Sequence, residues 1–354
     1  MNLPHFKIYT RQELLSVTKL RKFETKLGER ITGLKEGIKL EDALAELKSK
    51  YIVVGIPESI GVLANQGIAG TETAWPSFLQ SFLNIQSNDF LEGSELTILG
   101  YFDFADMQSL IDNNAHDFDE RVAAYRHAVN AIDDEVESLI KAIVVAGKIP
   151  LVVGGGHNNA YPLIKGAAKG LLQLQKISLA QINCINLDAH SDYRPAEGRH
   201  SGNAFRYAED DGFIQKYCVV GLHENYLPQN IWMDIVNNPF IDIITYEDIF
   251  IHEKRNFRQA VSHAIDFTED NYTGIELDLD VIENMLSSGV TPSGIPVQLA
   301  RQYINLSAAH AKIAYLHICE GAAQLSNGQS NETIGKTISF LISDFVKMHS
   351  SVKA

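Results

Sequence analysis

Eight short apolar runs, alternating with segments of helical periodicity, constrain the fold of this chain most strongly. The apolar runs occupy residues 51–56, 96–102, 149–153, 182–187, 217–221, 241–246, 275–280 and 313–319. The clearest segments with apolar residues every three or four positions are 119–147, 257–267 and 334–348. Alternating strands and helices predict a mostly parallel sheet with helices on both faces. We therefore expect an α/β protein with three αβα layers and an eight-stranded, mostly parallel sheet.

Residues 1–50 differ in pattern from the rest of the chain. They are charged, and apolar side chains recur at helical spacing between Leu14 and Leu34. We expect a helical extension here, which would pack on the domain or form an oligomer contact. Residues 51–354 contain no linker rich in Pro, Gly or Ser, so we expect them to form a single domain.

The composition argues against some partners and compartments. The 354 residues carry a formal net charge of −14 and no basic tract, so neither nucleic acid nor an anionic membrane is the expected partner. The first residues lack the apolar core of a signal peptide, and no apolar run is long enough to cross a bilayer, so we expect a cytoplasmic protein. Cys184, Cys218 and Cys319 lie in apolar runs, which is typical of reduced core thiols.

Two acidic motifs stand at the ends of predicted strands. Asp188-Ala-His190-Ser-Asp192 follows the run 182–187, and Asp278-Leu-Asp280 ends the run 275–280. In an extended strand, side chains two residues apart project from one face, so each motif would present its polar groups together. The carboxylates would repel each other unless a cation held them. Oxygen ligands joined by imidazole favour hard or borderline divalent ions, Mn²⁺ above all.

A third motif, Gly154-Gly-Gly-His157, follows the run 149–153. Its glycines let the backbone approach another group closely and would leave His157 at a strand end. Taken alone, the histidine also fits a hydrogen-bonded loop residue, and the glycines fit a phosphate cradle, although no Gly-x-Gly-x-x-Gly pattern supports a nucleotide. Ion-paired loop residues would likewise explain each acidic motif alone. Because three segments place metal-type ligands at one edge of a sheet, we favour a metal site.

Together the three motifs resemble those of the arginase, agmatinase and formimidoylglutamase family, the binuclear manganese ureohydrolases. That family has a Gly-Gly-x-His, an Asp-Ala-His-x-Asp and an Asp-x-Asp motif in this order, on a single α/β domain with an eight-stranded parallel sheet. The resemblance implies two Mn²⁺ ions per chain, bridged by two shared aspartates. The implied ligands of one ion are His157, Asp188, Asp192 and Asp278. The implied ligands of the other ion are Asp188, His190, Asp278 and Asp280.

The resemblance also implies three catalytic residues. Asp192 would accept a hydrogen bond from an activated water. His200 would carry a proton to the leaving group, because its ordinary pKa suits that task. Glu320 would pair with the planar cationic NH₂ groups of the substrate.

Substrate contacts are expected in the loop that follows Asp192. Arg194 is the residue best matched to a carboxylate at the amino-acid end of a substrate, although a solvated arginine is an equally simple interpretation. Ser201 and Asn203 are expected to contact the substrate as well.

Four short sites, two single residues and two dipeptides, depart from the family pattern. Gly156 stands where several members have Asp, and a glycine at this point resembles the formimidoylglutamases. Glu276 stands where Ser or a similar small residue is frequent, and Glu283-Asn284 and Ala322-Ala323 replace an Asp-Pro and an Asn-Pro. None of these changes removes an implied metal ligand. They alter the surroundings of the site and so leave the identity of the substrate open.

The function that the resemblance implies is a metal-dependent hydrolase of a linear amidine or guanidinium C–N bond. The chain looks most like the formimidoylglutamases, which convert N-formimino-L-glutamate to L-glutamate and formamide in histidine degradation. Arginine, agmatine or a guanidino acid are alternative substrates, and a single-metal deacetylase-like or non-catalytic relative is an alternative class. The expected partner is a small amidine or guanidinium molecule, and a homo-oligomer is left open.

Overall fold

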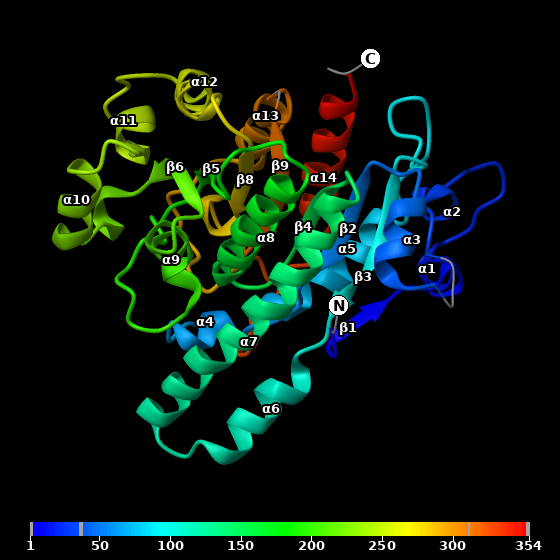
Figure 1. The fold of residues 1–354 in the computed structure, drawn as a ribbon, viewed down its shortest axis with the longest axis horizontal. Coiled ribbons are helices and arrows are strands. Elements are labelled where there is room, and N and C mark those ends of the chain that lie inside the picture. Colours follow the sequence, from blue (N-terminus) through cyan, green and yellow to red (C-terminus); the bar gives the residue numbers. More distant parts are fainter. Residues whose placement is uncertain (1–2, 35–37, 311, 352–354) are drawn as a thin grey trace.

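A single nine-stranded sheet runs through the computed structural model, which describes residues 3–34, 38–310 and 312–351 (Figure 1). The strands, in chain order, are β1 (Phe6–Ile8), β2 (Tyr51–Gly55), β3 (Leu96–Phe102), β4 (Ile149–Val153), β5 (Ile182–Leu187), β6 (Ile214–Leu222), β7 (Ile241–Thr245), β8 (Thr273–Asp278) and β9 (Ile313–Cys319). Their order in the sheet is β1-β3-β2-β4-β9-β8-β5-β6-β7. The strands β2 to β9 are parallel, and they correspond to the eight apolar runs of the sequence.

The ninth strand is β1, which the sequence did not predict. It pairs antiparallel with β3 at the edge of the sheet, where Phe6 lies opposite Phe102. The expected count of eight is therefore too low by one, because a three-residue edge strand is too short to show a periodicity. Within residues 3–34 and 38–50, the predicted extension also contributes three helices and buries Leu14, Leu27 and Ile31. The division at residue 50 stays a prediction, and residues 1–2, 35–37 and 352–354 lie outside the described chain.

Helices cover both faces of the sheet (Figure 1). They are α1 (Arg11–Val17), α2 (Leu27–Arg30), α3 (Leu40–Glu46), α4 (Ile60–Ala64), α5 (Ala74–Phe82), α6 (Ala105–Asn114), α7 (Phe118–Val145), α8 (Ala160–Gln173), α9 (Ala204–Asp210), α10 (Gln229–Val236), α11 (Tyr246–Phe250), α12 (Phe257–Thr268), α13 (Val297–Ala308) and α14 (Ile334–Ser351). Short 3₁₀ turns are η1 (Thr71–Thr73), η2 (His157–Asn159), η3 (Ser201–Asn203), η4 (Glu224–Tyr226) and η5 (Leu279–Val281). The helices predicted from periodicity correspond to α7, α12 and α14. No helix in the described part of the chain is long and apolar enough to span a membrane.

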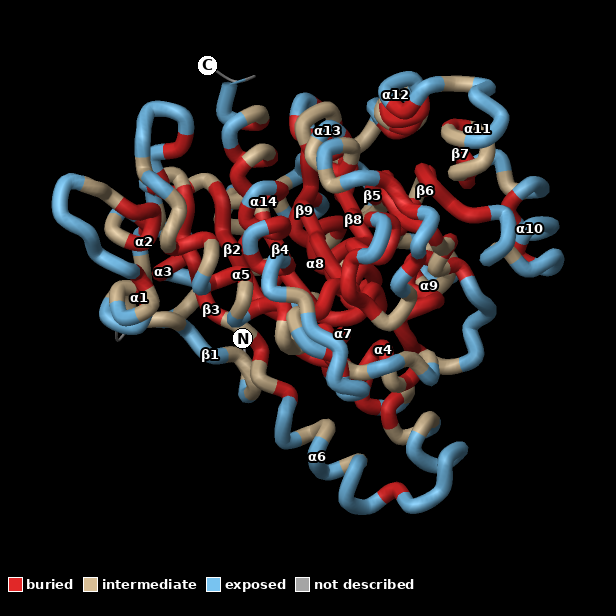
Figure 2. Tube along the Cα trace, turned by 180° about the vertical axis from the view of Figure 1, so that it is seen from behind, coloured by how far each residue is buried: buried red, intermediate tan, exposed pale blue. Residues whose placement is uncertain are grey.

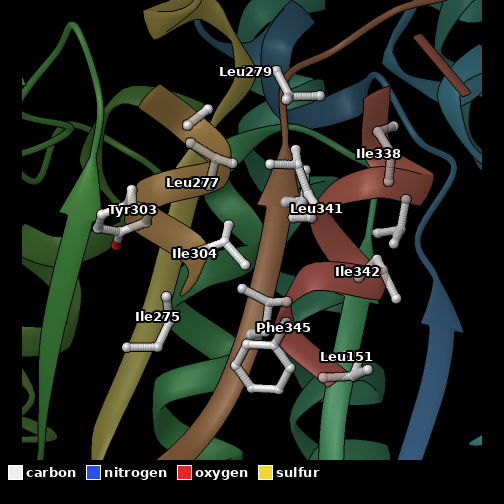
Figure 3. Packing of buried hydrophobic residues seen from close by; sticks show 14 of the residues in the cluster. Leu151, Ile275, Leu277, Leu279, Tyr303, Ile304, Ile338, Leu341, Ile342 and Phe345 are labelled. Carbon is white, nitrogen blue, oxygen red and sulfur yellow. The ribbon is translucent and has the colours of Figure 1, made fainter. Parts of the chain in front are cut away.

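Side chains of the sheet alternate between two apolar cores, which makes the structure three-layered. On β2, Tyr51 and Val53 face one core with helices α5, α12, α13 and α14, while Ile52 and Val54 face the other core with α4, α7, α8 and α9. Figure 2 shows the strands buried and the outer faces of the helices exposed, and Figure 3 shows α13 and α14 packed on the central strands. Each fully buried aliphatic side chain of this kind contributes about 1.5–3 kcal/mol. The two cores therefore hold the central strands rigidly.

Four central strands end along one edge of the sheet. β4, β9, β8 and β5 are neighbours and run in the same direction. In open α/β sheets, ligands bind outside the carboxyl ends of strands, where the order of the strands reverses. Here β4 is followed in the sequence by β5, which lies on the far side of β9 and β8. The three motifs and Glu320 all lie at this edge.

Candidate metal centre

The glycine motif places His157 at the end of β4. Gly154 and Gly155 have φ values of 91° and 77°, in the left-handed region that a residue without Cβ adopts readily. The turn is fixed by the buried carboxylate of Glu58, whose Oε1 accepts hydrogen bonds from Gly156 N at 3.0 Å and from Asn159 Nδ2 at 2.7 Å. The imidazole of His157 is consequently buried at the edge of the sheet.

The two acidic motifs are held by Asx turns, which corrects the expected strand geometry. Of these acidic and histidine side chains, only that of Asp278 belongs to a strand; Asp188, His190 and Asp192 follow the end of β5, and Asp280 lies in η5. Asp188 Oδ1 accepts from His190 N at 2.6 Å, and Asp278 Oδ1 accepts from Asp280 N at 2.8 Å. An Asx turn bonds a carboxylate to the backbone two residues on, so it produces the same spacing of two that a pleated strand would.

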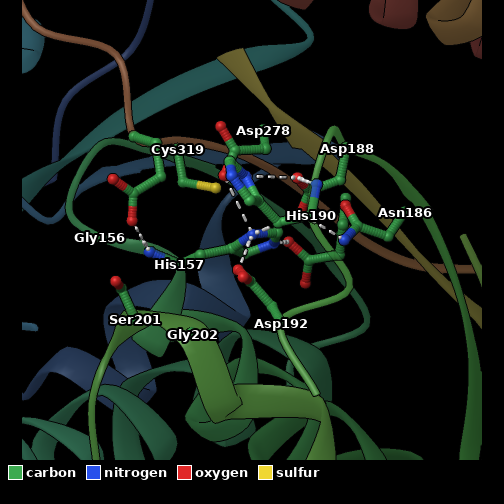
Figure 4. Close-up of polar contacts among 12 residues, drawn as sticks. Gly156, His157, Asn186, Asp188, His190, Asp192, Ser201, Gly202, Asp278 and Cys319 are labelled. Carbon is green, nitrogen blue, oxygen red and sulfur yellow. Dashed lines mark hydrogen bonds and ion pairs between the residues drawn. The ribbon is translucent and has the colours of Figure 1, made fainter. Parts of the chain in front are cut away.

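One set of ligand atoms surrounds Nδ1 of His157 (Figure 4). This nitrogen lies 2.7 Å from Asp192 Oδ2, 3.2 Å from Asp188 Oδ2 and 3.3 Å from Asp278 Oδ2. The four ligand atoms all lie within 4.8 Å of one another; His157, Asp188 and Asp278 are buried, and the Asp192 side chain is 11% exposed. Asp192 adopts φ of 44°, an uncommon conformation for a residue with a side chain, which turns its carboxylate toward His157.

A second set gathers around His190. Its Nδ1 lies 3.0 Å from Asp280 Oδ2 and 3.6 Å from Asp188 Oδ1, and these three residues could also hold an ion. Asp188 belongs to both sets, whereas Asp278 groups with the first set only. The ring of His190 stacks on Tyr226, with centroids 4.9 Å apart and an interplanar angle of 15°.

The electrostatics of this cluster suit divalent cations. Burial, and then the charges of Asp280 and Asp188, raise the pKa of Asp278 well above its ordinary value, so the carboxylates repel one another as they stand. Among the described residues, His157 Nδ1 and Asp280 Oδ1 are buried without a hydrogen-bond partner. Buried polar atoms normally have partners. A cation in each ligand set would both supply a partner to these atoms and offset the repulsion between the carboxylates. The donor set of carboxylates and imidazoles therefore fits two divalent ions.

Cys319 lies close to His157 but is a poor candidate ligand. His157, His317 and Cys319 form a further buried group in which the ligand atoms come close enough to hold an ion. Burial raises the pKa of the Cys319 thiol well above its ordinary value, and its Sγ points to Leu277 O at 3.7 Å. A neutral thiol binds metals weakly, because the thiolate is the ligand form.

A cavity of about 540 Å³ opens above the cluster and connects it to the outside. Its lining includes Asp192, Asp278, Asp280 and Glu320 at the base. Glu320 has φ of 62°, and its Oε1 accepts a hydrogen bond from His157 N at 2.8 Å. Burial raises the pKa of Glu320 to about 8. Strained backbone at Glu320 and Asp192 is the kind of feature that concentrates at functional sites.

Arg194 and Ser201 both line the cavity, and their predicted contacts with the substrate stay predictions. The Arg194 side chain is 48% exposed and donates to Asn65 Oδ1 at 2.9 Å and to Glu197 Oε1 at 3.1 Å. Asn65 Nδ2 in turn donates to Ser201 Oγ at 3.2 Å. The guanidinium is thus held in place and still accessible to a ligand.

His200 and Asn203 lie beneath the loop and do not line the cavity. His200 Nδ1 accepts from Gly202 N at 3.1 Å, and its Nε2 lies 3.2 Å from Glu197 Oε1. Burial, and then nearby arginines, lower the pKa of His200 to about 3, so the ring is neutral at pH 7. Asn203 Nδ2 donates to Gly198 O at 2.8 Å and braces the loop. The predicted roles of His200 and Asn203 in catalysis and substrate binding stay predictions.

The Arginase family matches residues 49–342. This chain belongs to the arginase family. A formimidoylglutamase of Psychrobacter cryohalolentis is 26% identical to this family member over 285 residues, which are 76% of this chain and 78% of that protein. A formimidoylglutamase of Macrococcus caseolyticus is 24% identical over 311 residues, which are 86% of this chain and 89% of that protein.

Solved structures of the arginase family superpose on the chain at low sequence identity. The formimidoylglutamase of Bacillus subtilis gives a TM-score of 0.69 at 16% identity and covers 94% of each chain. The formiminoglutamase of Trypanosoma cruzi with Mn²⁺ gives a TM-score of 0.69 at 17% identity and covers 93% of this chain and 99% of that chain. This likeness confirms the expected fold. The prediction of an arginase-family hydrolase is confirmed as well.

Several residues of this arginase-family site were not found from the sequence. Glu197 contacts Arg194, Arg126 and His200 at once, and Asn65 reaches Arg194 from 129 positions away. Tyr226 was missed because a tyrosine in a polar segment carries no signal of stacking. For Glu197 the only signal was its place in a polar loop, and for Asn65 the sequence offered none.

Proposed function

We propose that this arginase-family chain is a formimidoylglutamase that uses two Mn²⁺ ions to hydrolyse N-formimino-L-glutamate to L-glutamate and formamide. The observation that carries the proposal is the pair of ligand sets that share Asp188 at the base of a cavity, with Arg194 at its mouth. Relatives named formimidoylglutamase support the substrate. Crystal structures of the T. cruzi enzyme with Mn²⁺ support the metal.

The ligand atoms favour manganese over zinc. His157, Asp188, Asp192 and Asp278 would hold one ion, and Asp188, His190, Asp278 and Asp280 the other. Carboxylate-rich sites with few imidazoles suit Mn²⁺, whereas thiolates favour Zn²⁺. When bound, the two ions would supply a water of lowered pKa and thus hydroxide at neutral pH.

The side chains around the cavity would orient the substrate and handle its protons. Arg194 would bind the remote carboxylates, and Glu320 would face the planar formimino group, so that its carbon lies over the base of the cavity. Asp192 would accept a hydrogen bond from the attacking water. Addition of water at the formimino carbon, followed by cleavage of its bond to the glutamate nitrogen, releases formamide once that nitrogen takes a proton.

The predicted proton transfer from His200 would pass through Glu197, and it would require the ring to take up a proton that it does not hold at pH 7 in the free chain. Glu197 Oε1 lies 3.2 Å from His200 Nε2, and Glu197 also lines the cavity. A positioned general acid typically contributes about 10²–10⁴-fold to turnover. His200→Asn should lower kcat by that amount and leave the metal content unchanged.

The test is a substrate panel on chain stripped by a chelator and reloaded with metal. We expect no turnover without metal, better recovery with Mn²⁺ than with Zn²⁺, and the highest kcat/KM for N-formimino-L-glutamate among that substrate, arginine, agmatine and a guanidino acid. Arg194→Ala should raise KM strongly for the dicarboxylate and hardly affect agmatine. Arg206→Ala is the matched control, because Arg206 pairs with Asp210 and Asp234 outside the cavity.

Other outcomes would point to the rival functions. A preference for agmatine, or an unchanged KM in Arg194→Ala, would remove the carboxylate argument and with it the substrate. One ion per chain at saturation would favour the single-metal class. Two ions without turnover of any amidine or guanidinium would favour a non-catalytic relative.

A further inference from the structure

A buried carboxylate, Glu276, lies directly behind the candidate metal ligand His157. Glu276 is a fully buried residue of β8, two positions before Asp278. Its Oε2 lies 3.5 Å from His157 Nε2, on the side of the ring opposite to the carboxylates that surround Nδ1. No described residue forms a hydrogen bond with His157 Nε2. Glu276 is therefore a buried carboxylate within reach of this nitrogen.

Two residues of the neighbouring strand hold the Glu276 carboxylate. Tyr315 OH donates to Glu276 Oε1 at 2.6 Å, and His317 Nδ1 lies 2.7 Å from Oε2. The contacts follow from the register of β8 and β9, in which Glu276 is directly opposite His317. A Cβ at Gly274, opposite Tyr315, would lie 2.5 Å from the tyrosine Cζ, so this glycine leaves the ring the space it needs. The carboxylate is thus fixed from two sides.

An imidazole that binds a metal through one nitrogen usually donates its other N–H to a carboxylate or carbonyl, which fixes the tautomer and the orientation of the ring. We propose that Glu276 is the positioning residue that keeps Nε2 of His157 protonated and its Nδ1 lone pair directed at the ion, with Tyr315 and His317 holding Glu276 in place. This inference rests on the proposed two-ion function. It gives a role to the position at which the sequence departs from the small residue frequent in the family, because a serine side chain is too short to span the same gap.

The first experiment compares metal binding by the metal-free full chain and by Glu276→Gln. Mn²⁺ is added in steps and followed by calorimetry and by electron paramagnetic resonance, which distinguishes a lone ion from a coupled pair. The wild-type chain should bind two ions. Glu276→Gln has nearly the same shape but replaces an acceptor oxygen by a donor, so it should weaken one ion by about 10–100-fold, the usual cost of losing such an outer partner. The signal of the coupled pair should then give way to that of a lone ion at limiting Mn²⁺.

A pair of milder variants separates positioning from folding. Tyr315→Phe removes one hydrogen bond to the Glu276 carboxylate and should weaken the same ion about 2–10-fold, as expected for a single bond. Tyr303→Phe is the matched control, because its buried hydroxyl donates to the backbone oxygens of Glu276 and Ile185 and not to the carboxylate. It should leave the affinity for both ions unchanged even where it lowers the melting temperature. This pair also decides the question if Glu276→Gln does not fold.

The outcomes separate this inference from the function on which it rests. If the wild-type chain binds two ions and both Glu276→Gln and Tyr315→Phe bind them equally well, the role of Glu276 is overturned while the hydrolase stands. If Tyr315→Phe and Tyr303→Phe weaken both ions alike, Glu276 is a structural residue only, and the inference also fails. A wild-type chain that binds fewer than two ions overturns both, and a two-ion enzyme that prefers another substrate changes the substrate alone.

Discussion

The two candidate ligand histidines have contrasting surroundings. His157 has a side chain with 0% exposure, lies in a turn braced by Glu58, and has Glu276 behind its ring. His190 has a side chain that is 33% exposed and rests on the ring of Tyr226, itself half-exposed at the cavity wall. One imidazole is held by buried polar contacts and the other by an aromatic face next to solvent.

This difference predicts that the half of the site around His157 and the half around His190 differ in rigidity and in tolerance to substitution. Buried polar contacts are directional and cost free energy when one partner is lost, so the His157 half should be rigid and sensitive to substitution. Stacking is less directional and contributes about 0.5–1.5 kcal/mol, so the His190 half should tolerate change and exchange its ion more readily. Asp188, the residue common to both sets, is where the two halves meet.

We expect the largest effect from Asp188→Asn, because Asp188 belongs to both ligand sets and its loss should weaken both ions. A neutral side chain can keep the Asx turn but loses the negative charge that both ions would share. Turnover should fall by well over the roughly 100-fold that loss of an outer partner costs, and neither ion should be retained after gel filtration, as measured by elemental analysis. Asp270→Asn, which removes a carboxylate just before β8 at the opposite edge of the sheet, should retain both ions. Two ions retained in Asp188→Asn would contradict the shared role.

The next effect separates the halves. Of the two ligand histidines, Asp192 contacts His157 at 2.7 Å and Asp280 contacts His190 at 3.0 Å. Asp192→Asn should weaken the ion of the buried half, and Asp280→Asn should weaken the ion of the exposed half, with turnover reduced by orders of magnitude in both. Anomalous diffraction from Mn²⁺-soaked crystals of each variant would show which position is depleted. Loss of Mn²⁺ from the same position in both variants would contradict the assignment of Asp192 and Asp280 to different halves of the site.

A smaller effect is expected from the stack on His190. Tyr226→Leu keeps an apolar contact but removes the aromatic face, so the affinity for the ion on this side should fall only about 2–10-fold, in line with the free energy of an aromatic pair. Competition with a fluorescent chelator would measure the change. Tyr246→Leu is the control, because Tyr246 stacks on His223 at 4.4 Å and does not contact the ligands. A loss of 100-fold or more in Tyr226→Leu would show that the exposed half is as dependent on its support as the buried half.

The last prediction concerns Arg199 and Asp133, which support the turn at His157. Here we expect the smallest effect on ion binding, but a clear pH dependence of the free energy of unfolding. Arg199 Nη2 donates to Asn158 O at 2.8 Å, and Arg199 also pairs with buried Asp133. Burial raises the pKa of Asp133 from 3.8 to about 6, although Arg199 and Lys165 act in the opposite direction. The folded chain therefore holds this proton when the unfolded chain has lost it, and the free energy of unfolding should fall as the pH rises from about 4 through 6.

Asp133→Asn removes this titration, because an amide does not ionise. Relative to the wild-type chain, the metal-free variant should gain stability between pH 4 and pH 7 in urea unfolding, while Mn²⁺ affinity at fixed pH changes little. Asp344→Asn serves as the control, since Asp344 forms a two-bonded pair with Arg301 whose side chain is 41% exposed. If the free energies of unfolding of the wild-type chain and Asp133→Asn differ by the same amount at every pH in this range, the titration assigned to Asp133 is contradicted.

The fold was predictable where many residues repeat one pattern. The parallel strands are largely buried on both faces and so read as apolar runs, and the 28-residue helix α7 repeats its apolar positions many times. The edge strand β1 has three residues and is held by its pairing with β3, so no local signal distinguishes it. The spacing of two residues in the acidic motifs correctly predicted that their side chains converge. The convergence arises from Asx turns, however, and the sequence alone does not distinguish an Asx turn from a pleated strand.

The sequence by itself determined the ligand types and their local grouping, because Asp188, His190 and Asp192 are joined by short backbone and need only one turn to converge. Tertiary structure decided everything that depends on distant segments meeting. The order of β4, β9, β8 and β5 brings Asp278 to His157, and the register of β8 on β9 sets Glu276 against His317. Packing also put His200 beneath the loop and Arg194 at the cavity, although they are only six positions apart. Burial and contact across a sheet are properties of the packed chain, and no local spacing encodes them.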